Sequence, residues 1–258
     1  MTAGALLKSH PPGGNQGWAR TNYAGNVVTL LEGPVFVVGA VAGAVVGGAG
    51  APAAAAGLGS AAFGALDDLV GESPSKGLRG HLAAARRGEV TTGAIKMVGL
   101  GATGLLTAWI MDRPRTRTRP ITTLVGGAVV AGSANIVNLL DLRPGRALKV
   151  ALLLSAPLLA VGRGTPSSTA AAGAVAGAAI ACLPEDLAGR SMLGDTGANS
   201  AGALLGTALV ARTGLPGRLL ALAAVTALTL ASERFSFTTF IESTPGLREL
   251  DALGRPPV

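Results

Sequence analysis

Long apolar runs separated by short charged stretches constrain most strongly how this chain can fold. Only 14% of the residues are charged, against about 25% in a typical soluble domain. The mean hydropathy is +0.50. A helix needs roughly 20 mostly apolar residues to cross a bilayer, and the chain offers such runs repeatedly. The sequence therefore predicts an all-α, polytopic membrane protein.

We expect about eight transmembrane helices. The apolar stretch 34–66 would be about 50 Å long as one helix, well beyond a hydrocarbon core of ~30 Å. Glycines and Pro52 interrupt it near the middle, so we divide it there. The expected spans are 34–49, 52–66, 90–111, 121–140, 147–162, 168–183, 197–212 and 217–232. They form a transmembrane domain at 34–232, between an N-terminal segment at 1–33, read as a loop, and a polar tail at 233–258.

Eight crossings place five segments on one side, which we call face A: 1–33, 67–89, 141–146, 184–196 and 233–258. Counting Lys149 with its adjoining loop, face A carries 13 Lys and Arg residues, and the other face carries seven. The positive-inside rule therefore predicts that face A, with both termini, is cytoplasmic. Of the 14 Asp and Glu residues, only Asp112 falls on the other face. Solvation alone would not gather carboxylates on one side, so we expect an active surface on face A.

The stretch SMLGDTGANSAGALLG, residues 191–206, is the strongest candidate for that surface. Asp195 lies between Gly194 and Gly197, just before an apolar run of small residues. Carboxylate oxygens here could hold a hard cation such as Mg²⁺. The glycines would allow a tight turn and let a phosphate approach the backbone. The alternative is that Asp195 only caps a helix.

Other polar residues stand at the face A ends of neighbouring spans. Asp67 and Asp68 close the second span, and Lys76 follows them. The fourth span closes with residues whose i, i+3, i+6 spacing puts them on one helix face: Asn135, Asn138 and Asp141. Each group alone could be an ordinary solvated helix end. Gathered on one face, with glycines beside them, they predict a metal and phosphate site.

The order of these motifs resembles a known family. The polyprenyl-phosphate N-acetylhexosamine-1-phosphate transferases carry an Asp-Asp loop, an Asn-x-x-Asn-x-x-Asp stretch and a Met-Gly-Asp-x-Gly-Ser stretch, all on cytoplasmic loops. This chain is similar in GALDDLVGESPSKGL, NIVNLLD and MLGDTGANSAGALLG, in the same order. The resemblance covers about residues 20–210.

The resemblance implies an enzyme of cell-envelope glycan synthesis in the cell membrane. Such an enzyme moves a sugar-1-phosphate from a nucleotide-sugar to a membrane polyprenyl phosphate, with Mg²⁺, and releases a nucleoside monophosphate. It implies that Asp195 ligates Mg²⁺, that Asp68 lies at the metal, and that Asp67 or Asp68 serves as a base near the lipid phosphate. Gly194 and Gly197 would adjoin the substrate. The remaining substrate-binding residues would be Lys76 at a phosphate, Asn138 and Asp141 on the nucleotide side, and Asn135.

After Asp141 the chain departs from the family pattern. The stretch LRPGRALK places Arg143 and Arg146 where the family has apolar or acidic residues. We expect both arginines to contribute to donor recognition, because arginine can bind a phosphate through two hydrogen bonds. The alternative is that their positive charge simply anchors the helix ends.

Two other functions remain as alternatives. One is a non-catalytic scaffold or lipid-phosphate binder on the same fold. The other is a transporter, which is disfavoured because Lys96 is the only charged residue more than three positions inside a span. It lies near the end of that span, where it could snorkel to the surface. The net charge of +7 favours anionic lipid headgroups over nucleic acid. A homodimer is one candidate assembly.

Overall fold

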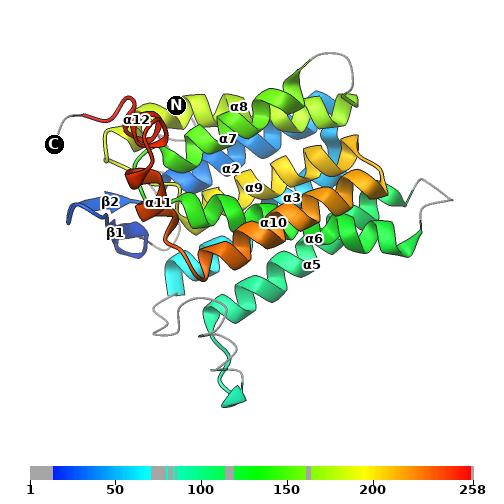
Figure 1. Ribbon diagram of the computed structural model, residues 1–258, viewed down its shortest axis with the longest axis horizontal. Coiled ribbons are helices and arrows are strands. Elements are labelled where there is room, and N and C mark those ends of the chain that lie inside the picture. Colours follow the sequence, from blue (N-terminus) through cyan, green and yellow to red (C-terminus); the bar gives the residue numbers. More distant parts are fainter. Residues whose placement is uncertain are drawn as a thin grey trace.

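The structure of the chain is a computed structural model that describes residues 14–70, 80, 84, 86–113, 119–160 and 164–256. Long helices lie side by side in a bundle (Figure 1). The main helices are α2 (Glu32–Ala44), α3 (Gly50–Val70), α5 (Thr92–Asp112), α6 (Pro120–Leu140), α7 (Arg146–Leu159), α8 (Pro166–Leu187), α9 (Gly194–Arg212) and α10 (Leu215–Ser232). Two short helices, α11 (Phe237–Ser243) and α12 (Leu247–Ala252), follow.

Within the described residues, each of the eight ranges that the sequence predicts as spans contains a helix. Among the described residues, five helical segments are long and apolar enough to cross a membrane, and one of them comprises α2 and α3 together. By length and composition the chain is therefore a multi-pass membrane protein. The number of crossings and the cytoplasmic orientation of face A stay predictions.

The apolar stretch 34–66 folds back on itself, as its length predicts. Between α2 and α3 the chain passes through a π-helical segment, Val45–Ala49, in which Gly48 has a φ of 99°. Residues with a side chain rarely adopt this conformation, so glycine permits the reversal. The two helices then pack so closely that a Cβ on Gly57 would lie only 2.4 Å from Val41 Cγ2.

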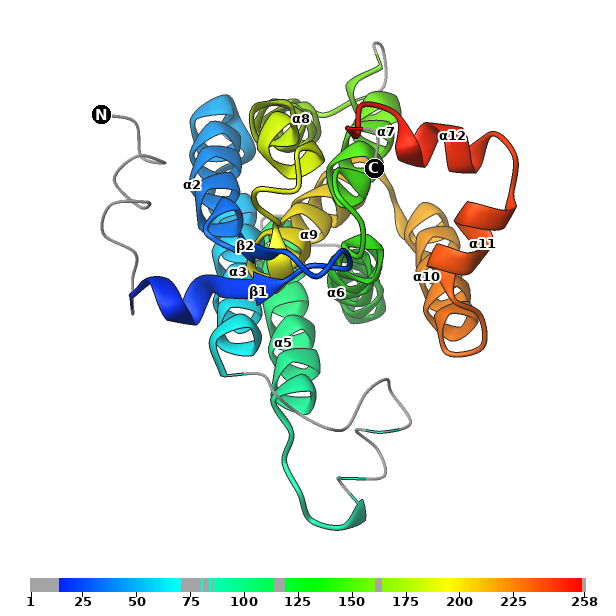
Figure 2. The same cartoon turned by 90° about the vertical axis from the view of Figure 1, so that its left-hand side faces the viewer.

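Helix α9 is the centre of the bundle (Figure 2). Nearly every residue from Thr196 to Ala208 is buried, against α3, α6 and α8 among others. Its surface of Gly, Ala, Ser and Thr lets backbones approach, which is how membrane helices pack without bulky side chains. A Cβ on Gly202 would lie 2.2 Å from the carbonyl oxygen of Ser133 in α6.

The helices alternate in direction, so their ends gather at two faces. We call the end at which α3, α6, α8 and α10 finish and α5, α7 and α9 begin the site face (Figure 1). It is the face A of the sequence. At the opposite face Arg218 and Asp112 form a buried ion pair with two contacts, of 2.7 and 2.9 Å.

The N-terminal segment, expected to be a loop, contains a small β-hairpin at the site face. Strand β1 (Ala19–Thr21) pairs antiparallel with β2 (Val27–Thr29) after a 3-10 turn, η1 (Asn15–Trp18). The Asn22 side chain accepts hydrogen bonds from two backbone N–H groups of the connecting turn, which stabilises the reversal. Trp18 and Leu30 are buried there against α3 and the segment before α9. Strands of three residues are too short to show alternation in the sequence.

Candidate functional site

Asp68 holds the start of the central helix. Its Oδ1 accepts a hydrogen bond of 3.0 Å from the backbone N–H of Asp195. Its Oδ2 accepts bonds from the backbone N–H and the hydroxyl of Thr196, at 2.8 and 2.6 Å. A carboxylate in this position satisfies backbone donors that lack a partner inside the helix and complements the positive end of the helix dipole. The last turn of α3 is thus fixed to the first turn of α9.

Asp67, Lys96 and Asp195 form a cluster of three charges beside that junction. Lys96 Nζ, from α5, lies 2.9 Å from Asp67 Oδ2 and also donates to Asp195 Oδ2. The side chains of Lys96, Asp67 and Asp195 remain 15%, 22% and 23% exposed, so water and small ligands can reach them. Two carboxylates from distant parts of the chain therefore meet around a single cation.

Glycines make this meeting of helices possible. Gly194, with a φ of 59°, faces Asp68, and a Cβ there would lie 3.0 Å from Asp68 Oδ2. A Cβ on Gly64 of α3 would lie 2.3 Å from the carbonyl oxygen of Asp195. Gly197 packs against Gly33 at the start of α2. A Cβ on Gly197 would lie 2.9 Å from the Cα of Gly33. The tight turn expected from Gly194 is present, whereas access of a phosphate to this backbone stays a prediction.

Asp141 lies just past the end of α6, near the same helix start. It is buried, and it approaches the backbone N–H of Gly194. Burial raises the pKa of Asp141 well above its usual range, and the nearby charges of Asp186, Asp195 and Asp68 raise it further. A carboxyl in this setting favours its protonated form.

The two asparagines of the same motif lie further along α6. Asn138 is half-buried one turn before Asp141. Asn135 lies another turn away and donates a hydrogen bond of 3.3 Å to the hydroxyl of Thr229 in α10. The structure therefore brings Asp141 to the start of α9, whereas it directs Asn135 towards a neighbouring helix.

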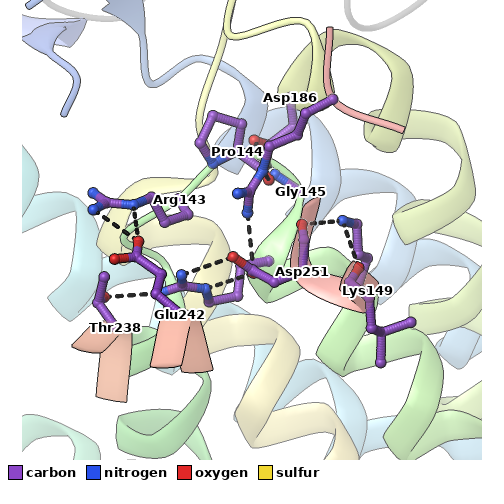
Figure 3. Close-up of polar contacts among 11 residues, drawn as sticks. Arg143, Pro144, Gly145, Lys149, Asp186, Thr238, Glu242 and Asp251 are labelled. Atoms are coloured by element: carbon purple, nitrogen blue, oxygen red, sulfur yellow. Dashed lines mark hydrogen bonds and ion pairs between the residues drawn. The ribbon is translucent and has the colours of Figure 1, made fainter. Parts of the chain in front are cut away.

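Arg143 and Arg146 are both engaged within the protein. Arg146 is almost fully buried and binds Asp251 of α12 through two contacts, of 2.7 and 2.9 Å. Arg143 lies over the ring of Tyr23, 4.3 Å from its centroid, and donates a 3.0 Å hydrogen bond to Glu242 of α11 (Figure 3). These contacts agree with the alternative of structural anchoring, and a role in donor recognition stays a prediction.

Two further buried carboxyls at the site face were not predicted. Glu32, at the start of α2, accepts a hydrogen bond from the hydroxyl of Ser191. Asp186, at the end of α8, accepts one of 2.9 Å from the backbone N–H of Gly145. The other oxygens of both groups, Glu32 Oε1 and Asp186 Oδ2, are buried, and the two carboxyl groups can share a hydrogen bond with each other when one of them is protonated. The position of Asp186 at the end of an apolar run was a signal in the sequence.

Lys96 is the most consequential residue that the sequence reasoning placed elsewhere. The sequence left open that it could snorkel to the surface, and in the structure its ammonium group contacts two carboxylates. Its position was the available signal, because every other charge within a predicted span lies within three residues of a span end. Lys76, a predicted phosphate contact, lies outside the described residues. In the described part of the chain, no group of three or more His, Cys, Asp or Glu side chains is arranged to hold a metal ion.

Two carboxylates in this arrangement could hold a divalent cation, whereas binding of a phosphate stays a prediction. Asp67 and Asp195 supply oxygen ligands of the kind that Mg²⁺ prefers, and Mg²⁺ is commonly held by one or two carboxylates together with substrate phosphates. The residues present therefore fit this ion. The structure pairs Asp195 with Asp67 rather than with Asp68, whose oxygens already bind the α9 backbone.

Comparison of the chain with known proteins gave no matching family model and no matching curated protein.

Proposed function

We propose that this chain is a membrane transferase that moves a sugar-1-phosphate from a nucleotide-sugar to a polyprenyl phosphate. The observation that carries the proposal is the convergence of Asp67 and Asp195 on the Lys96 ammonium at the site face. A charge pair whose only role is to stabilise the helix bundle can be fully buried, as Asp112 and Arg218 are. This cluster instead remains accessible at the end of the bundle.

In the proposed reaction, a phosphate oxygen of the lipid attacks the sugar-bearing phosphorus of the donor. A new P–O bond forms there, and the P–O bond to the departing nucleoside monophosphate breaks. Both reactants are anions, so positioning and charge neutralisation supply most of the catalysis. Mg²⁺, held by Asp67 and Asp195, would supply positive charge to the phosphates. Lys96 contacts both carboxylates and offsets one of their two negative charges. In the reaction it would pair with a substrate phosphate.

Asp68 contributes as a positioning residue in this proposal. Its bonds to the backbone of Asp195 and Thr196 fix the first turn of α9 and thereby the direction in which the Asp195 side chain points. Effective catalysis needs such groups held within a fraction of an ångström.

An apolar cavity supports a long-chain lipid as the acceptor. It has a volume of about 690 Å³ and lies between α6, α7, α9 and α10. Leu140 and Leu228 line it towards the site face, and Arg212 lines it towards the opposite face. A prenyl chain is apolar and flexible, so several of its units could fill this space.

A non-catalytic scaffold is the second candidate, and two observations favour it. Asp68 uses both oxygens to cap α9, and Arg146 is bound to Asp251, so two predicted site residues have structural roles. A scaffold would keep these contacts without any transfer reaction.

The transfer assay separates the two. Purified protein in lipid nanodiscs is incubated with radiolabelled nucleotide-sugars, polyprenyl phosphate and Mg²⁺, and the lipid-linked product is counted. The proposal predicts product with the wild type and none with Asp195→Asn, which keeps the shape of the side chain and removes its charge. Arg190→Ala, which removes an exposed ion pair with Glu185 on the same face, is the matched control and should keep full activity. No product with any nucleotide-sugar, from folded wild-type protein, would favour the scaffold.

A further inference from the structure

The segment that follows α10 exposes several large apolar side chains beside its charged ones. Its large apolar side chains point outward, with exposed fractions of 66% for Phe235, 58% for Phe240 and 66% for Leu253. Leu247 and Leu250 are each 41% exposed. Surface helices in water normally turn such side chains to the core, so this surface needs another apolar medium.

Ion pairs with the turn between α6 and α7 fix this orientation. Asp251 is buried and binds the guanidinium of Arg146, which also donates a 2.8 Å hydrogen bond to the hydroxyl of Thr238. Glu242 pairs with Arg143 at 3.0 Å (Figure 3). These contacts reach both short helices, α11 and α12, from the turn between α6 and α7. The segment cannot rotate its apolar side chains inward without breaking them.

Hydrogen bonds from two more basic residues strengthen the attachment. Lys149 Nζ lies 3.1 Å from the backbone carbonyl oxygen of Leu250 (Figure 3). Arg255 Nε donates a 2.8 Å hydrogen bond to the carbonyl oxygen of Pro144. The segment is therefore attached at both of its short helices and beyond them, and its outward surface is a fixed feature of the fold.

The outward surface continues the apolar exterior of α10. Among the described residues of α10 only Arg218 is buried, and Leu220 and Leu230 are 74% and 56% exposed. The helix ends at Ser232, and Phe235 lies three residues further along the chain. Figure 1 shows α11 and α12 at the end of the bundle where α10 finishes, and Figure 2 shows them at its edge rather than over its middle. A bilayer that covers α10 would meet the segment at its headgroup region.

We propose that residues 233–253 lie in the membrane interface, with their apolar side chains among the upper acyl chains of the site-face leaflet. Helices that lie in this plane bury one apolar face at the boundary of headgroups and acyl chains. Arg234 and Arg248 are exposed on the same segment and meet the phosphates of anionic lipids. The occupant of the surface is therefore lipid, and the inward ion pairs couple the α6–α7 turn to the membrane surface.

Environment-sensitive labels test the placement. Single cysteines replace Phe240, Leu247 or, as the matched control on α12, the exposed and charged Glu249, and each carries an NBD fluorophore. The native Cys182 is buried and should not compete for the label. In nanodiscs of mixed neutral and anionic lipid, the labels at 240 and 247 should emit at shorter wavelength than the label at 249. Lipids with nitroxide on the upper acyl chain should quench them several-fold more strongly.

Two outcomes would overturn the proposal. Equal quenching of all three labels by aqueous iodide would place the segment in water. Emission at shorter wavelength without quenching by the nitroxide lipids, together with cysteine cross-links between protomers at 240, would place the surface against a second copy of the chain.

Discussion

The ion pair between Asp112 and Arg218 makes a prediction whose size follows from its burial. The two side chains are 4% and 2% exposed and share two contacts, of 2.7 and 2.9 Å. Arg218 also donates to the carbonyl oxygens of Thr122 and Thr213, at 3.0 and 3.3 Å. The pair thereby ties α5 to α6, α9 and α10 at the opposite face.

Arg218→Met leaves Asp112 as a buried carboxylate whose main charged partner has gone. Breaking a buried pair in this way costs about 3–5 kcal/mol. For a protein of this size that corresponds to a fall of roughly 6–20 °C in the midpoint of thermal unfolding. The measurement is thermal unfolding in detergent micelles, followed by intrinsic fluorescence at a fixed heating rate.

Arg190→Met provides the matched control, because Arg190 and Glu185 form an exposed pair, with side chains 61% and 44% exposed. Exposed pairs contribute about 0–1 kcal/mol, so this change should barely move the midpoint. The double variant Asp112→Leu, Arg218→Met should lose less than the sum of the single variants, by about 0.5–3 kcal/mol. Equal midpoints for Arg218→Met and Arg190→Met would refute the reasoning.

Three further predictions concern packing, charge and topology. Gly64→Ala should prevent the close approach of α3 to α9, because its Cβ would lie 2.3 Å from the Asp195 carbonyl oxygen. Gly101→Ala is the control, because its Cβ would meet nothing within 4 Å. Gly64→Ala should lower the unfolding midpoint and the monodispersity of the protein, and Gly101→Ala should leave both unchanged. Asp141→Asn should raise the midpoint at neutral pH. The pKa of Asp141 is raised in the folded state, so the folded protein loses stability as the pH rises from the unfolded-state pKa through the folded-state pKa. The unfolding midpoint, measured from pH 4 to pH 9, should show this loss in the wild type and less of it in Asp141→Asn. If the site face is cytoplasmic, a membrane-impermeant thiol reagent on intact cells should label a cysteine at Arg119 and spare one at Glu89; the reverse pattern would invert the topology.

The sequence predicted where the helices lie because their ends carry strong signals. Glycine and proline interrupt the stretch 34–66, and the structure reverses the chain there at Gly48. Charged and polar residues close α3 and α6 at the predicted places. The hairpin at 19–29 was missed because its strands are short, and its contacts with α3 and the segment before α9 join distant parts of the chain.

The central position of α9 could not be predicted from its composition. Its run of Gly, Ala, Ser and Thr reads as a membrane helix, but which neighbours surround it depends on how tightly each pair of helices can approach. The contacts of Gly64 and Gly202 with other backbones decide this, and they appear only in three dimensions.

The candidate site was predicted in part. The sequence brought Asp67, Asp68 and Asp195 to one face, and the structure places them at the junction of α3 and α9. Their division of labour could not be predicted, because adjacent carboxylates at a helix end point in different directions. Asp68, which was expected at the metal, caps α9 instead. Lys96, which was not among the predicted site residues, joins the charged cluster.

The partner of a charged residue in the C-terminal segment could not be predicted either. Arg146 follows a turn, and from the sequence we expected its guanidinium group to bind a donor phosphate through two hydrogen bonds. Its partner in the structure is Asp251, more than a hundred positions away. A single sequence contains no signal that separates a carboxylate of the same chain from a phosphate of a ligand, since arginine binds both in the same geometry.

The central claim is that Asp67 and Asp195 form the binding place of a divalent cation beside Lys96. It is tested most directly by the Mg²⁺-dependent shift in the unfolding midpoint of the wild type, Asp195→Asn and Lys96→Met. At a Mg²⁺ concentration of about 100 Kd, a ligand that binds only the folded state adds ~2.7 kcal/mol, or roughly 5–11 °C. The account predicts this shift in the wild type, its loss in Asp195→Asn, and an equal or larger shift in Lys96→Met, where no ammonium competes for the carboxylates. The same shift in the wild type and Asp195→Asn, or no shift in any of the three proteins, would contradict the account.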